Sequence, residues 1–102
     1  MPTSLLTMSI AVPVATRYLV EWYRPNLTRQ LIDDMVAGLD KATANMCAEG
    51  SPVSLLITVA VPADEVLYGV FAAESPDVVR TACERAGCLA ERMSADIDAR
   101  TF

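Results

Sequence analysis

Acidic and aromatic side chains on predicted strands are the residues of this chain whose types and positions suit chemistry. Glu21 and Tyr23 lie on the first predicted strand, Tyr68 on the third and Asp96 on the last. Carboxylate oxygens bind divalent cations, and a carboxylate beside a phenol can hold a polar ligand or exchange a proton. We therefore take these four residues as candidate ligand-binding residues, and Glu21 and Asp96 also as candidate metal ligands.

The absence of histidine narrows this chemistry, because the chain contains none. Nucleophile arrangements that pair serine or cysteine with histidine are excluded, and a metal site would need carboxylates, backbone carbonyls or thiolates. Only four glycines are present, and they form no phosphate-binding loop. We assign no catalytic residue.

Two interpretations of these acidic and aromatic residues stay open. Glu21 is either a structural carboxylate at the sheet rim, paired with Arg24 or Arg92, or a functional one in a cleft. The aromatic side chains either fill the core or line a small-molecule cavity. These side chains are Trp22, Tyr23, Tyr68 and Phe71.

The three cysteines, Cys47, Cys83 and Cys88, lack the two-residue spacing of a zinc or redox pair. They are typical of free thiols in a reducing compartment, which favours a cytoplasmic protein. Cys47 and Cys83 lie on or beside apolar helix stripes, so we expect them to pack as small hydrophobes. Cys88 follows Gly87, and we expect it to be exposed.

The composition limits the kinds of partner that the chain can bind. A net charge of −5, with no Lys/Arg cluster, argues against nucleic acid, because binding to phosphate backbones depends on basic residues. Residues 1–16 carry no charge, and their apolar run is too short to cross a bilayer. We expect no membrane partner, and we interpret 1–16 as an arm with an extra edge strand around 9–12, before a single domain over 17–102.

Periodicity and turn residues predict six elements in the order β-α-β-β-α-β. Thr28 and Ser75 stand where helix N-caps are expected, and Gly50 and Gly87 where helices end. The second predicted strand is apolar in both of its alternating sets. The expected strands are 17–23, 53–61, 66–73 and 92–99, and the expected helices are 28–49 and 75–86.

This order is typical of an α+β, ferredoxin-like domain, in which two helices cover one face of an antiparallel sheet. The other face is uncovered, and leaving an apolar strand in water costs about 25 cal/mol per Å². We therefore expect a homodimer packed sheet to sheet, a dimeric α/β barrel-like sandwich. The arm over 1–16 is the competing cover.

Three short segments carry a family resemblance over about residues 17 to 98. They are 18–21 (Tyr-Leu-Val-Glu), 66–80 from the third strand into the helix that begins Ser75-Pro76-Asp77, and 86–89 (Ala-Gly-Cys-Leu). Together they resemble a small bacterial ferredoxin-like family of unknown function that includes a nickel-binding protein. The resemblance implies a dimer and a site for nickel or another divalent metal. Typical members have a histidine in the second strand, where this chain has Leu56, Ile57, Thr58 and Val59.

The sequence thus predicts a small cytoplasmic dimeric binding protein that holds a divalent metal or small ligand beside the open sheet face. The alternative is a cofactor-independent enzyme, resembling a monooxygenase or isomerase, that uses the same cleft. That alternative rests on analogy between folds.

Overall fold

The computed structural model describes residues 15–100 and 102, and it forms an α+β sandwich with the predicted order of elements. The predicted extra edge strand lies outside these residues. The strands are β1 (Thr16–Tyr23), β2 (Val53–Val61), β3 (Val66–Ala73) and β4 (Arg92–Ala95), and the helices are α2 (Arg29–Ala48) and α3 (Pro76–Arg85). A 3-10 turn, η1 (Pro62–Asp64), joins β2 to β3.

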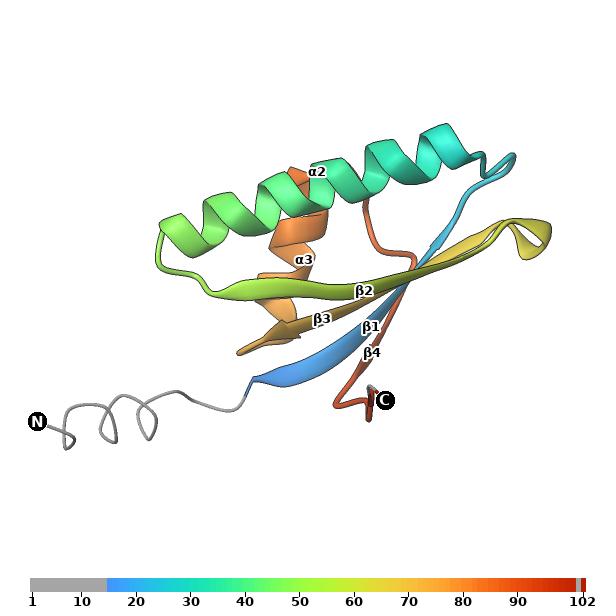
Figure 1. Ribbon diagram of the computed structural model, residues 1–102. Coiled ribbons are helices and arrows are strands. Elements are labelled where there is room, and N and C mark those ends of the chain that lie inside the picture. Colours follow the sequence, from blue (N-terminus) through green and yellow to red (C-terminus); the bar gives the residue numbers. More distant parts are fainter. Residues whose placement is uncertain (1–14, 101) are drawn as a thin grey trace, which may run out of the picture.

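The four strands form one sheet in the order β2-β3-β1-β4, and every neighbouring pair is antiparallel. Figure 1 shows α2 running along the sheet with α3 crossing behind it. The two helices contact each other, and both pack on the sheet. This is the ferredoxin-like arrangement that the sequence predicts.

Local sequence signals set the helix ends. The Thr28 hydroxyl accepts a hydrogen bond from the Leu31 amide at 3.1 Å, and the Ser75 hydroxyl caps α3 in the same way. Gly50 and Gly87 follow the two helices with φ values of 91° and 72°, a conformation that favours glycine. These predicted caps are confirmed.

The core lies between the sheet and the helices. Tyr18, Val20 and Trp22 of β1 face it with exposures of 4% or less. Trp22 is fully buried, donates from Nε1 to the Cys88 carbonyl at 2.9 Å and meets Phe71 edge to face at 6.2 Å. The expectation that Cys88 is exposed is wrong, because the chain after α3 folds back under Trp22. Cys88 is buried, whereas Cys47 is exposed.

A β-bulge in β2 reverses the alternation of its side chains, so that odd-numbered residues face the helices before the bulge and the uncovered side after it. Val53 and Leu55 pair with residues of β3 that face the helices, but the register shifts between Leu55 and Ile57. After the shift, Ile57 pairs with Val70 and projects from the uncovered side of the sheet. The simple alternation read from the sequence is therefore wrong for this strand.

The predicted last strand, 92–99, is also too long. β4 ends at Ala95, and Asp96 has a φ of 55°, which takes the chain out of the extended conformation. Within the described residues, no helix has the length and apolar character needed to cross a bilayer.

Candidate functional site

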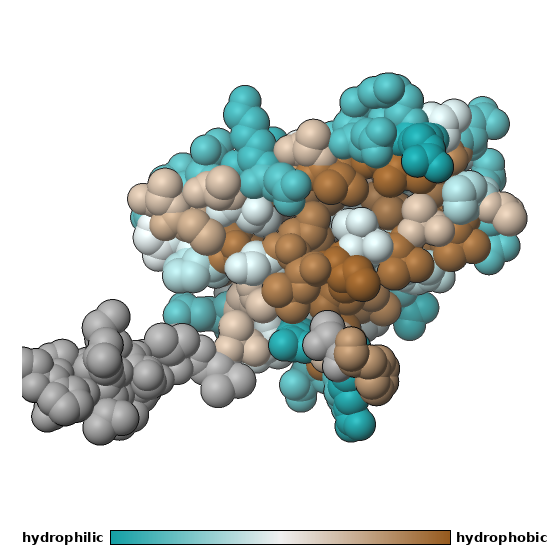
Figure 2. Space-filling view, in the orientation of Figure 1, coloured by the Kyte–Doolittle hydropathy of each residue, from teal (hydrophilic) through white to brown (hydrophobic). Residues whose placement is uncertain are grey.

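The face of the sheet opposite the helices, here called the open face, is apolar on one half and polar on the other. On β2, Ile57 and Val59 are 52% and 49% exposed. Figure 2 shows apolar side chains gathered over the strands below α2. Strand alternation and register place the following residues on this face: Ile57, Val59 and Val61 of β2; Val66, Tyr68, Val70 and Ala72 of β3; Arg17, Leu19, Glu21 and Tyr23 of β1; and Arg92 and Ser94 of β4.

Glu21 is the chemically distinctive residue of the open face. It is only 8% exposed, although no helix covers this side. Its carboxylate accepts a hydrogen bond from the Tyr23 hydroxyl, and its Oε2 lies 3.5 Å from Nε of Arg92. Glu21 is thus a charged group that is largely shielded from solvent on the polar half of the open face.

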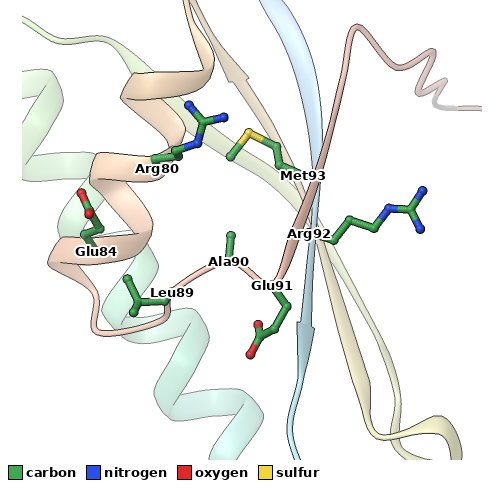
Figure 3. A pocket seen from close by; sticks show the side chains of 7 residues that line it. All are labelled: Arg80, Glu84, Leu89, Ala90, Glu91, Arg92 and Met93. Carbon is green, nitrogen blue, oxygen red and sulfur yellow. The ribbon is translucent and has the colours of Figure 1, made fainter.

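A row of three side chains crosses the sheet at Glu21. Tyr68 on β3 and Arg92 on β4 are its two direct neighbours across the strands. Directly opposed side chains in such a sheet have Cβ atoms about 4.5–5.5 Å apart. Figure 3 shows Met93 directed toward α3 and Arg92 directed away from it, which places Arg92 on the open face.

The structure brings together three of the four predicted ligand-binding residues and leaves out the fourth. Glu21, Tyr23 and Tyr68 are neighbours, but Asp96 follows the far end of β4. Ile97 donates to the Arg17 carbonyl, so this segment lies beside Arg17, about 13 Å along β1 from Glu21. Glu21 and Asp96 therefore do not converge, and Asp96 instead lines a separate hollow of about 460 Å³ with Ala15 and Thr16.

Arg92 is a site residue that sequence reasoning treated only as a structural partner. The alternation of Arg92 and Ser94 with Met93 and Ala95 marked its face, and the strand order made β4 a neighbour of β1. These two signals together locate it beside Glu21. Two partners were proposed for Glu21. It contacts Arg92, whereas Arg24 pairs with Glu91.

The Tyr23 phenol is held in its neutral form. Its hydrogen bond to the Glu21 carboxylate raises the pKa of Tyr23 above the ordinary value. A tyrosine that acts as a base needs the opposite shift. The pair is therefore suited to binding a polar group rather than to removing a proton.

This pairing predicts how Tyr23 titrates. In Glu21→Gln we expect the pKa of Tyr23 to fall toward the ordinary tyrosine value, because the acceptor loses its charge. Because the folded-state pKa is raised, the interaction stabilises the fold at pH values below the ordinary tyrosine pKa and is lost as the pH rises through the folded value. Ultraviolet absorbance of tyrosinate measures this, and Tyr23→Phe identifies the signal. Identical Tyr23 titrations in wild type and Glu21→Gln would contradict it.

A second hollow lies on the helix side of β4. It has a volume of about 420 Å³ and lies between α3 and the segment 89–93. Figure 3 shows Arg80 and Glu84 on its helix wall, with Leu89 and Ala90 from the loop before β4. Arg80 is already paired with Asp77 at 2.8 Å, and Glu91 is paired with Arg24, so two charged groups that line this hollow already have partners.

Metal ligands do not gather in the described part of the chain. Among residues 15–100 and 102, no three cysteine, aspartate or glutamate side chains lie close enough together to hold an ion. Burial raises the pKa of Cys83 to about 12 and also raises the pKa of Cys88, so these thiols stay protonated at neutral pH.

Comparison with known proteins gives the fold. No protein-family model and no curated protein sequence matches the chain. The crystal structure of SCO4226 from Streptomyces coelicolor A3(2) is similar, with a TM-score of 0.69 and 15% sequence identity. The match covers 83% of this chain and 99% of that one. At this identity, the likeness supports a small ferredoxin-like domain and carries no assignment of ligand or activity.

Proposed function

We propose that this protein is a homodimeric, non-enzymatic binding protein that holds a small organic ligand beside the polar half of its open face. The observation that carries the proposal is Glu21, a shielded carboxylate beside Tyr68 and Arg92 on a face that no helix covers. Burial of such a charge is costly unless it serves a partner or is well paired. Besides the hydrogen bond from Tyr23, its ionic contact to Arg92 is a single one at 3.5 Å.

The apolar half of the open face supplies the dimer contact. Ile57 and Val59 are each about half exposed and lie beside Val61, so a second copy would remove a continuous apolar strip from water. Each Å² of apolar surface buried contributes about 25 cal/mol. With the β2 strands of the two copies in contact, the part of the sheet formed by β1 and β4 would line a cleft between them.

An organic ligand suits this cleft better than a metal ion. One glutamate, two phenols and a guanidinium offer hydrogen bonds and aromatic contact. A divalent cation, by contrast, needs several oxygen ligands, and Arg92 would repel it. Nickel binding, which the family resemblance implies, is therefore the less favoured form of the proposal.

Ile57→Asp tests the dimer. We expect it to weaken self-association at least tenfold, because a charge would be buried without a partner. Sedimentation velocity over a concentration series measures this. Ala44→Asp adds the same charge to the exposed side of α2 and should leave association unchanged.

A wild-type monomer at micromolar concentration would contradict the dimer. If deleting residues 1–14 then increased the binding of an apolar dye, the arm would be the cover instead. NMR titration of the full-length protein with nickel chloride tests the metal alternative. Shifts centred on Glu21, abolished in Glu21→Gln, would favour the ion over an organic ligand.

A further inference from the structure

We infer that the cleft selects a zwitterion, an α-amino acid with an apolar or aromatic side chain; this inference rests on the proposed function. Its basis is the direct opposition of Glu21 and Arg92 on neighbouring strands, with Tyr68 on the other side of Glu21. A negative and a positive group therefore lie side by side at the edge of an aromatic and apolar surface. An amino acid presents the complementary pair of charges next to its side chain.

The contact between Glu21 and Arg92 leaves both groups able to bind further. It joins Oε2 to Nε over 3.5 Å, which is longer than the 2.7–3.2 Å typical of a hydrogen bond. The contact uses Nε, so the two terminal nitrogens can still form the paired contacts that guanidinium makes with a carboxylate. The Arg92 side chain is 69% exposed, and a long ion pair with one solvent-exposed partner contributes little to stability.

Glu21 provides the complementary half of the site. Its Oε1 is bonded by the Tyr23 hydroxyl, and each carboxylate oxygen can accept a second hydrogen bond. An ammonium group carries three donors and would approach between the rings of Tyr23 and Tyr68, which attract cations. The net charge of −5 favours the approach of that end of the ligand.

Ligands with a single charge fit this arrangement less well. An amine would engage Glu21 but would bring its charge close to Arg92 without a carboxylate to offset it. An organic acid would engage Arg92 but would place its charge beside Glu21. A ligand that carries both charges offsets each like-charge contact with an opposite charge. The arrangement therefore selects ligands by the charges they carry as well as by their shape.

Calorimetric titration of the full-length protein with three related compounds tests the inference. L-phenylalanine carries both charges, 2-phenylethylamine only the ammonium and 3-phenylpropanoate only the carboxylate. We expect L-phenylalanine to bind at least tenfold more tightly than either analogue. Glu21→Gln should remove its advantage over the acid, and Arg92→Gln its advantage over the amine. Arg80→Gln makes the same change on the helix side of β4 and should alter nothing.

Thermal melts establish that each variant is folded, and if Glu21→Gln does not fold, Arg92→Gln carries the test. Equal affinity for L-phenylalanine and either analogue would overturn zwitterion selection but would retain the cleft as a binding site, provided that NMR shifts map to Tyr23 and Tyr68. Binding of L-phenylalanine that neither variant weakens would overturn the site itself. Failure of all three compounds, together with a wild-type monomer, would overturn both this inference and the proposed function.

Discussion

Trp22→Ala is expected to lower the free energy of unfolding by about 3–5 kcal/mol, the usual cost of truncating a large buried aromatic residue. Trp22 has no exposed surface, and its ring packs edge to face on Phe71. The substitution would also leave the Cys88 carbonyl without its indole donor, which lies at 2.9 Å. The core would therefore lose a large apolar volume and one buried hydrogen bond.

Urea denaturation followed by circular dichroism measures this loss. Arg17→Ala is the control, because Arg17 lies on the same strand, faces the other side of the sheet and is exposed. Its truncation should cost about 1 kcal/mol or less. Similar losses at the two positions would contradict the assignment of the helix side of β1 to the core.

Gly69→Ala is expected to cost about 1–3 kcal/mol, the range for overpacking a filled core. A Cβ at this position would lie 2.8 Å from Cζ3 and 2.9 Å from Cη2 of Trp22. The ring is fully buried and cannot swing into solvent, so the strand or the ring must shift. Gly69 is thus required by the size of Trp22, which lies across the same face of the sheet.

Gly38→Ala is the contrasting change in the other glycine within a regular element. Its added Cβ would meet the Ala86 carbonyl oxygen at 3.4 Å, and alanine is about 1 kcal/mol better than glycine inside a helix. We expect this variant to be neutral or stabilised when measured by the same denaturation. A Gly69→Ala protein as stable as wild type would show that the Trp22 ring is free to move.

The order and ends of the elements could be predicted because their signals are local. Thr28 and Ser75 cap helices through their own hydroxyls, and Gly50 and Gly87 end them through their own backbone angles. The ferredoxin-like topology then follows from the order of the elements. The prediction that the strand of Glu21 lies next to the last strand is confirmed, because β1 and β4 are neighbours in the sheet.

The contents of the site could not be predicted fully, because they depend on register. The bulge in β2 and the end of β4 at Asp96 are decided by pairing with β3 and β1, and no periodicity marks them. The register of β4 on β1 separates Asp96 from Glu21 and places Arg92 beside Glu21 instead. The burial of Cys88 likewise depends on a contact with Trp22, which lies 66 positions earlier in the chain.

The bulge in β2 also identifies a position where the chain length can vary. Leu56 is the additional residue at the bulge. It lies between Leu55, whose side chain faces the core, and Ile57, whose side chain lies on the open face. Removing Leu56 alone would straighten the ladder and leave every other β2 side chain on its present side. Removing Ser54 instead would force the first half of the strand either to realign or to turn its side chains over. A homologue one residue shorter in β2 can therefore keep both surfaces only if the gap falls at Leu56.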